Sequence, residues 1–250
     1  MTALSVNLNK IALIRNSREG NYPSIIEHAQ LCIDNGADGI TVHPRPDQRH
    51  IRPDDVRQLA SLVQNIADVE FNIEGNPFAP ALADYPGLIP LVEQTKPAQC
   101  TLVPDNNEQL TSDHGFDLNS SGEALTPIIQ RLQSQGIRVS LFMDPDLEQI
   151  KLASQIGADR IELYTGPYAA AWGSDQADHI FQKHLEAATL ATELGMGVNA
   201  GHDLNLDNLK QFASIPNLLE VSIGHALTLR ANLEYSQTAL DCPDLGHALH

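Results

Sequence analysis

The chain of 250 residues has a formal net charge of −17 and a hydrophobic content of 42%. Its length fits one (β/α)8 barrel, and its acidity argues against nucleic acid and anionic membrane surfaces as partners. Cys32, Cys100 and Cys242 are widely spaced and form no CxxC pair, so we expect a reducing, cytoplasmic location without a disulfide framework or metal knuckle. Because Lys10 and Arg15 interrupt the N-terminal segment, we expect neither secretion nor a membrane span.

Eight short apolar runs, spaced roughly 30 residues apart as eight βα units require, are typical of parallel strands buried on both faces. Segments with helical period lie between them, and glycines such as Gly157 suit the position after a helix. The alternative of an open, doubly wound sheet is disfavoured because no GxGxxG follows the first run. The runs are Leu4–Asn7, Gly39–His43, Phe71–Glu74, Gln99–Pro104, Arg138–Asp144, Arg160–Thr165, Met196–His202 and Leu219–His225.

The pattern therefore predicts an α/β fold, a (β/α)8 TIM barrel with extended strand-to-helix loops. We expect a single domain over residues 1–240 and a polar C-terminal tail at 241–250. Three connections after strands, at 75–87, 105–119 and 166–174, are longer than a simple turn needs. We interpret them as lids over a site, with tolerated surface insertions as the alternative.

Polar residues stand where most of the predicted strands end. Chemistry in a parallel barrel is located at these carboxyl ends, so we expect the side chains to meet at one rim. Glu74 and Glu162 close otherwise apolar strands, and partial burial raises a carboxyl pKa toward acid–base use. The alternative is that each is a structural carboxylate paired with an arginine such as Arg45 or Arg160.

The basic segment His43–Arg52 (HPRPDQRHIR) contains three arginines and two histidines against a single acid. Guanidinium groups bind phosphate through paired hydrogen bonds, so we interpret this segment as part of a phosphate site, with a surface ion-pair loop as the alternative. His202 and His225 each follow a glycine at the ends of the last two strands, where many barrels bind phosphate.

Asn7 and Asn9 alternate along the first strand, and the cations that follow, Lys10, Arg15 and Arg18, offer a second anion site or simply a solvated basic helix start. His43, Glu74, His202 and His225 are types that bind metal ions. However, the sequence has no HExxH motif and no clustered aspartates, so we predict no obligatory metal.

The strand ends together resemble those of the pyridoxine 5′-phosphate synthase family over nearly the whole chain. The matching stretches are VNLNKIALIRNSR (Val6–Arg18), GADGITVHPRPDQRHI (Gly36–Ile51), FNIE (Phe71–Glu74), LVPD (Leu102–Asp105), IELYTGPYA (Ile161–Ala169), VNAGHDL (Val198–Leu204) and SIGHAL (Ser222–Leu227). The resemblance implies a (β/α)8 barrel that assembles into a homo-octamer and needs no metal or organic cofactor. It also implies a reaction in vitamin B6 biosynthesis that joins 3-amino-2-oxopropyl phosphate to 1-deoxy-D-xylulose 5-phosphate.

The resemblance also implies roles for individual residues. His43 and Glu74 would accept protons, His202 would donate one, and Glu162 would stabilise charge in the transition state. The deoxyxylulose phosphate would contact a first set of residues, and the amino-ketone phosphate a second. The first set is Arg45, His50 and Thr111, in a site that Asn9 and Lys10 also touch; the second is Asn7, Arg18, Gly224 and His225, with Asp203 beside them.

Two departures from the better-known form of the family stand at this predicted site. Asn9-Lys10 replaces Asp-His, and Asp203 replaces a glycine; we expect the Asp203 side chain to point away from phosphate or to cap the next helix. Two other functions remain open from the residues: a metal-assisted barrel hydrolase or isomerase, and a non-catalytic barrel that binds a phosphorylated ligand.

Overall fold

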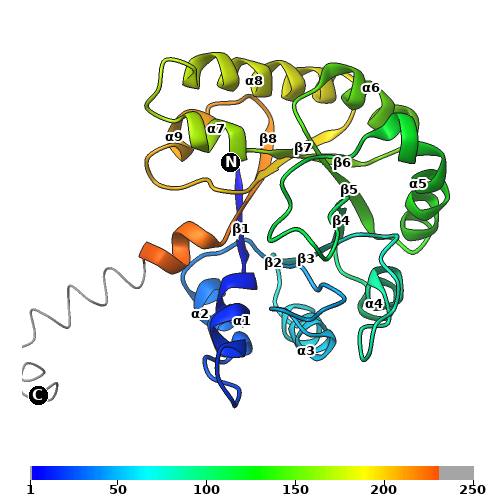
Figure 1. Cartoon of the computed structure of the whole chain (residues 1–250), viewed down its shortest axis with the longest axis vertical. Coiled ribbons are helices and arrows are strands. Elements are labelled where there is room, and N and C mark those ends of the chain that lie inside the picture. The colour runs from blue at the N-terminus through cyan, green and yellow to red at the C-terminus, as the bar shows by residue number, and fades with distance from the viewer. Residues whose placement is uncertain (1, 231–250) are drawn as a thin grey trace, which may run out of the picture.

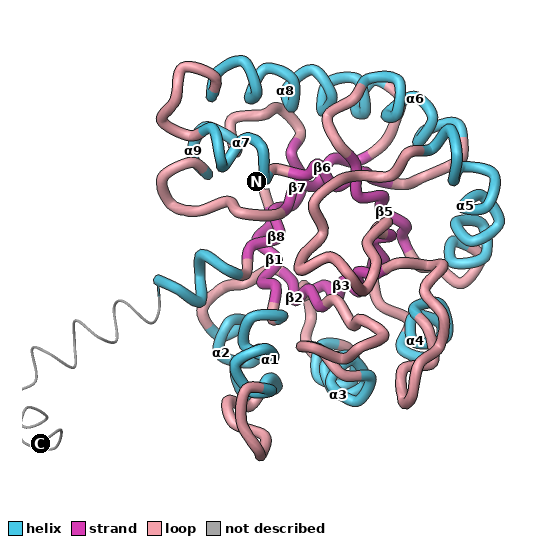
Figure 2. Tube along the Cα trace, viewed as in Figure 1, coloured by secondary structure: helices cyan, strands magenta, loops and turns pink. Residues whose placement is uncertain are grey.

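The computed structural model describes residues 2–230 and shows eight parallel strands closed into a barrel in the order β1 to β8. Helices surround the barrel on all sides, as Figure 1 shows, and the strands form the central ring in Figure 2. Val6 on β1 pairs with Ile40 on β2 and with Ile223 on β8, which closes the ring. The strands are β1 (Ala3–Asn7), β2 (Gly39–Val42), β3 (Glu70–Gly75), β4 (Gln99–Leu102), β5 (Arg138–Met143), β6 (Arg160–Tyr164), β7 (Gly197–Gly201) and β8 (Leu218–Ile223).

The helices follow the strands in the expected alternation, with an additional helix after β1 and after β6. They are α1 (Asn9–Asn16), α2 (Ile25–Asp34), α3 (Pro53–Val63), α4 (Leu88–Thr95), α5 (Leu118–Gln133), α6 (Leu147–Gln155), α7 (Gly166–Ala171), α8 (Ala177–Glu193) and α9 (Leu209–Phe212). The predicted (β/α)8 fold is confirmed. The predicted domain limit at residue 240 and the tail at 241–250 lie outside the described residues and stay predictions.

One of the three connections that we interpreted as lids is partly helical, and the role of all three as lids stays a prediction. Residues 166–171 form the short helix α7 because Tyr168 is fully buried against Phe212 and donates its hydroxyl to the Asn208 carbonyl at 2.9 Å. The connections after β3 and β4 are long, as predicted, and run from residue 76 to 87 and from residue 103 to 117. Of the long loops predicted at the rim, these two remain as loops.

The strands alternate between apolar side chains that face the helices and polar side chains that fill the barrel. Ile40, Ile73 and Leu141, for example, are fully buried in the hydrophobic core. Inside the barrel, Asn199 of β7 donates to Gln99 of β4 at 3.3 Å. Residues on strands this far apart in the ring meet only across its interior, so the centre of the barrel is polar.

Helix α3 shows how local sequence places a helix on the barrel. Pro53 occupies its first turn, and the Arg52 backbone N–H donates to Asp55 Oδ2 at 2.7 Å, which satisfies a donor that the helix leaves unpaired. The same carboxylate receives a bidentate pair from Arg15 of α1, at 2.5 and 2.9 Å, with both residues buried. This ion pair ties α1 to the start of α3.

We predict that Asp55→Ala lowers the free energy of unfolding by about 3–5 kcal/mol, because it leaves the buried Arg15 guanidinium without its carboxylate. Asp54 is the matched control, since it is the preceding residue and its side chain is 82% exposed beside Arg57. Asp54→Ala should cost less than about 1 kcal/mol. Urea denaturation of both variants checks this; equal losses would contradict the assignment.

Candidate active site

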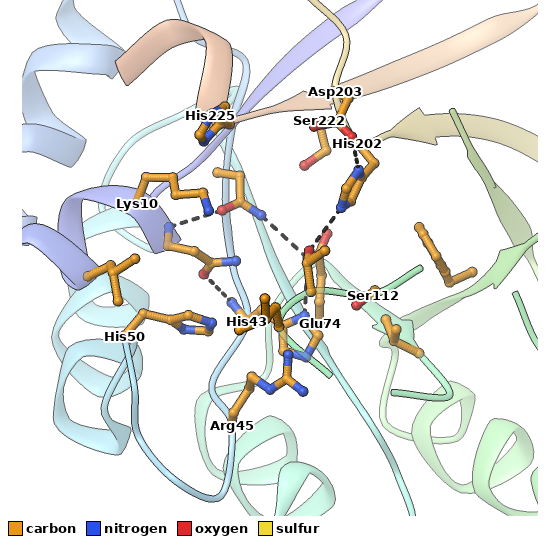
Figure 3. Close-up of a pocket in the computed structure, with 18 of the residues that line it drawn as sticks. Lys10, His43, Arg45, His50, Glu74, Ser112, His202, Asp203, Ser222 and His225 are labelled. Carbon is orange, nitrogen blue, oxygen red and sulfur yellow. Dashed lines mark hydrogen bonds and ion pairs between the residues drawn. The ribbon is translucent and has the colours of Figure 1, made fainter. Parts of the chain in front are cut away.

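A cavity of about 530 Å³ opens at the carboxyl ends of the strands. Figure 3 shows side chains entering it from opposite sides, with His202 and His225 facing His43 and Arg45. Every predicted site residue except Arg18 lines it: Asn7, Asn9, Lys10, His43, Arg45, His50, Glu74, Thr111, Glu162, His202, Asp203, Gly224 and His225. Arg18 is exposed after α1 and does not line the cavity, so its phosphate-binding role stays a prediction.

Asparagines at the end of β1 position the neighbouring acid–base groups. The His43 backbone N–H donates to Asn9 Oδ1 at 2.9 Å, and the Asn9 backbone N–H donates to Asn7 Oδ1 at 3.0 Å. Asn7 Nδ2 in turn approaches Glu74 Oε2 at 3.5 Å. Because an amide oxygen accepts the His43 N–H as an aspartate oxygen does, Asn9 preserves this acceptor despite the departure from the Asp-His pattern.

The His43 ring lies between two carboxyl groups. Its Nδ1 is 3.7 Å from Glu74 Oε2, and its Nε2 is 3.3 Å from Asp105 Oδ2. We did not predict Asp105 as a site residue from the sequence. It appeared there only as the last residue of the matching stretch LVPD (Leu102–Asp105). Its position directly after a barrel strand is the signal that marks it.

Among the described residues, neither Glu74 nor Glu162 forms an ion pair with an arginine or lysine, and both are buried. Burial raises the pKa of Glu74 well above its ordinary value, and the charges of Glu162 and Glu220 raise it further. Burial also raises the pKa of Glu162 to about 8, with Glu220 adding to the rise, although a hydrogen bond from Thr101 opposes it. Both carboxyls therefore favour the protonated form near neutral pH.

The alternative that these glutamates pair with Arg45 or Arg160 is not what the structure shows. Arg45 Nη1 contacts Asp105 Oδ2 at 3.2 Å, and Arg160 Nη1 contacts Glu220 Oε2 at 3.5 Å, at the other end of the barrel. Arg45 and Arg160, the arginines considered as partners from the sequence, therefore pair with Asp105 and Glu220 instead. Glu74 and Glu162 remain available for proton transfer.

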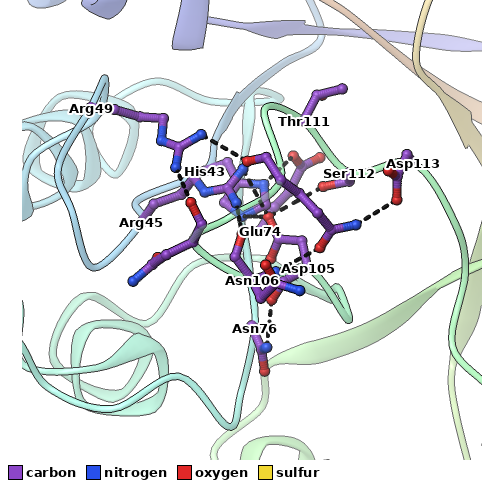
Figure 4. A network of polar contacts seen from close by, with 12 residues as sticks. His43, Arg45, Arg49, Glu74, Asn76, Asp105, Asn106, Thr111, Ser112 and Asp113 are labelled. Carbon is purple, nitrogen blue, oxygen red and sulfur yellow. Dashed lines mark hydrogen bonds and ion pairs between the residues drawn. The ribbon is translucent and has the colours of Figure 1, made fainter.

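The arginines of the basic segment hold the loop after β4, as Figure 4 shows. Arg45 Nη2 donates to the Asn106 carbonyl, and Arg49 donates to the carbonyls of Gln109 and Asn107 at 2.8 and 2.6 Å. Arg49 also pairs with Asp47, so the segment contains an ion pair as well as cations at the cavity. Arg45 itself also lines the cavity.

His50 enters the cavity as a neutral ring. Burial, together with the nearby charges of His43 and Arg45, lowers its pKa to about 3. The Ile51 backbone N–H donates to His50 Nδ1 at 2.9 Å, which leaves the proton on Nε2. The ring is thus a neutral hydrogen-bond donor beside Arg45.

His202 is held at both ring nitrogens. Its Nδ1 lies 2.7 Å from Asp203 Oδ2 and its Nε2 lies 2.9 Å from Thr111 Oγ1. The hydrogen bond from His202 lowers the pKa of Asp203 below its ordinary value, so the carboxylate accepts and Nδ1 carries the hydrogen. The Asp203 side chain therefore bonds to the adjacent imidazole and does not cap the next helix; that it points away from phosphate stays a prediction.

The glycines before the two histidines make room for other site residues. A side chain at Gly201 would collide with Glu162 Oε1, and one at Gly224 would lie 2.6 Å from the Asn7 carbonyl oxygen. In the structure these glycines allow Glu162 and Asn7 to approach the strands.

Between residues 2 and 230 no group of three or more His, Cys, Asp or Glu side chains is arranged to hold a metal ion. In the same part of the chain, no helix combines the length and hydrophobicity that a membrane span requires.

A closed parallel barrel that gathers imidazoles, buried carboxyls and an arginine at one cavity has the architecture of a (β/α)8 barrel enzyme. The family model described as pyridoxal phosphate biosynthesis protein PdxJ matches residues 4–240. The chain belongs to this family.

Curated relatives match nearly the whole chain. Pyridoxine 5′-phosphate synthase from Xanthomonas axonopodis pv. citri (strain 306) is 56% identical over 231 residues, 92% of this chain and 90% of that protein. The protein of the same name from Xylella fastidiosa (strain M23) is 53% identical over 234 residues, 93% of this chain and 90% of its own length. The predicted family is confirmed.

Solved structures with low sequence identity share the fold alone. The tryptophan synthase alpha chain from Legionella pneumophila subsp. pneumophila has a TM-score of 0.60 at 13% identity, covering 95% of this chain and 84% of that one. Deoxyribose phosphate aldolase from Aeropyrum pernix has a TM-score of 0.56 at 15% identity, covering 93% and 89%.

The raised pKa of Glu162 predicts a dependence of stability on pH. Between its ordinary pKa of 4.5 and about 8, the folded protein keeps a proton that the unfolded chain releases. Stability from this group is therefore complete below the lower value and is lost as the pH rises through the upper one. Relative to Glu162→Gln, the unsubstituted protein should lose up to about 1.4 kcal/mol per pH unit in this interval.

Urea unfolding of both proteins at several pH values from about 5 to 9 measures this difference. Glutamine keeps the size of the side chain and has no proton to release. Parallel curves for the two proteins would contradict the assignment of a raised pKa to Glu162.

Proposed function

We propose that the chain catalyses the reaction after which its curated relatives are named, the formation of pyridoxine 5′-phosphate in vitamin B6 biosynthesis. The substrates are 3-amino-2-oxopropyl phosphate and 1-deoxy-D-xylulose 5-phosphate, and inorganic phosphate and water leave. The observation that supports this most is the convergence of His43, Glu74 and His202 on one cavity. Several proton transfers at one place need several groups that titrate near neutrality.

In the proposed mechanism His43 and Glu74 act as a pair. Burial favours a protonated Glu74, so this residue becomes a base only after it gives up its proton. His43 Nδ1, 3.7 Å away, is positioned to take that proton. The remaining Glu74 carboxylate is then strongly basic because its surroundings destabilise the charge, and it removes a proton from the substrate.

His202 is the proposed proton donor on the opposite side of the cavity. Its Nδ1–H is held by Asp203, so the proton to be given away is on Nε2, which faces Thr111. Glu162, protonated near neutrality, donates a hydrogen bond to negative charge that develops on an oxygen of the substrate.

Two groups of cavity residues suit the two phosphate esters. Arg45, neutral His50 and Thr111 offer hydrogen bonds to the deoxyxylulose phosphate. Gly224 and His225, with Asn7 beside them, offer backbone donors to the amino-ketone phosphate, and residues 225–230 are helical. Lys10 lines the same cavity and adds a cation on the side of the deoxyxylulose phosphate. Asp203 lies near the second group, but its carboxylate charge is compensated by the hydrogen bond from the His202 ring.

The proposal includes properties that the family resemblance implies: a homo-octamer in the cytoplasm, acting without a metal or organic cofactor. No specific observation favours the two alternatives. A metal-assisted hydrolase or isomerase would lose activity with a chelator, and a non-catalytic barrel would bind a phosphorylated substrate without turnover.

We predict that chelator-treated protein given both substrates forms pyridoxine 5′-phosphate and releases inorganic phosphate. His43→Ala, Glu74→Gln and His202→Ala should each lower kcat by about 100-fold or more, the usual effect of losing a general acid or base. Lys151→Ala is the control, because Lys151 lies on the surface of α6 and pairs with Glu148.

Product formation is followed by absorbance of the pyridoxine ring, and folding by circular dichroism. Folded, chelator-treated protein that makes no product would overturn the proposed function. A variant that keeps nearly the full kcat would remove that residue from the mechanism.

A further inference from the structure

Asp105 lies behind the cavity and not in it. The carboxylate lines a second, smaller cavity of about 210 Å³, which His43 and Arg45 separate from the first. Asp105 follows β4 and is only 3% exposed. A carboxylate in this place cannot touch a substrate in the main cavity, so any effect on the reaction passes through its neighbours.

A single oxygen of Asp105 gathers three donors. Oδ2 lies 3.3 Å from His43 Nε2, 3.2 Å from Arg45 Nη1 and 3.4 Å from Ser112 Oγ. The Asp105 backbone carbonyl also accepts from Asn76 Nδ2 at 2.6 Å, which fixes the main chain at this point. The carboxylate is therefore held on several sides and has little freedom to rotate.

Asp105 and Glu74, on the two sides of the His43 ring, differ in charge. Burial alone would raise the pKa of Asp105, but His43 and Arg45 outweigh it and hold that pKa below the ordinary value. Burial raises the pKa of Glu74. The ring therefore has an ionised acid at Nε2 and a protonated one near Nδ1. Arg45 and the neutral His50 ring, whose centroid is 6.2 Å from that of His43, also lie close to it.

An ionised carboxylate only accepts hydrogen bonds, so the ring nitrogen that faces Asp105 carries the hydrogen. In a neutral imidazole the other nitrogen then has the lone pair. That nitrogen, Nδ1, is the one directed at Glu74 and the main cavity.

We propose that Asp105 is a positioning residue, which fixes the Nε2–H tautomer of His43 and so makes Nδ1 the atom that accepts protons in the reaction. This inference rests on the proposed function. Asp105 stabilises the imidazolium that forms when Nδ1 takes a proton, and it holds the ring in one orientation while it does so. The same oxygen also contacts Arg45, whose Nη2 is held independently by the Asn106 carbonyl.

The experiment compares Asp105→Ala and Asp105→Asn with Asp113→Asn. Asparagine keeps an oxygen that accepts from Nε2–H but removes the charge, whereas alanine removes both. Asp113 is the matched control, an acid of the same loop that is 56% exposed and pairs with His114.

We expect kcat to fall by about 100-fold in Asp105→Ala and by less in Asp105→Asn, with Asp113→Asn unchanged. The KM for deoxyxylulose phosphate should not rise, because Arg45 loses a competing acceptor. A purely structural role would instead raise KM or unfold the protein, which thermal unfolding detects.

The second measurement needs no turnover. The ¹⁵N shifts of labelled histidine in the resting protein should show His43 as the Nε2–H tautomer, and as a mixture of tautomers in Asp105→Ala. An Nδ1–H tautomer in the unsubstituted protein, or a kcat within threefold in Asp105→Ala, would overturn the inference. If the unsubstituted protein makes no product, the proposed function fails while the tautomer still tests Asp105.

Discussion

Two glutamates, Glu74 and Glu162, are buried at the inner end of the cavity, and the electrostatics of the site follow from this burial. Neither has an arginine partner, and their charges oppose each other, so the protonated forms are favoured near neutral pH. Arg45 lies close by, but its guanidinium forms an ion pair with Asp105. The cavity therefore has two neutral acids, Glu74 and Glu162, at its inner end and the Arg45–Asp105 ion pair behind them. In this arrangement protons move without leaving isolated buried charges.

The barrel supports this arrangement because its strands alternate. Apolar residues such as Ile73 face the helices and form the core, while Asn72 and Thr101 face inward and bond to each other at 3.2 Å. Thr101 also reaches Glu162 at 3.4 Å, so the interior network continues into the site. The alternation that stabilises the fold also directs the carboxyl of Glu162, in the middle of β6, into the barrel interior.

The strand ends could be predicted from the sequence because parallel strands in a barrel all finish on one side. That rule alone brings His43, Glu74 and His202 together. It does not determine contacts between loops or the direction of a side chain, and these account for the errors. Asp203 turns to its neighbour His202, and a buried Tyr168 draws residues of an expected lid into α7. Arg18 follows α1 and does not line the cavity, and its phosphate-binding role stays a prediction.

Infrared difference spectroscopy of the resting protein at neutral pH tests the protonation of the buried glutamates most directly. The spectrum should contain the band of a protonated carboxyl group, and Glu74→Gln and Glu162→Gln should each weaken it. A spectrum with only ionised carboxylates, unchanged by both substitutions, would contradict the account.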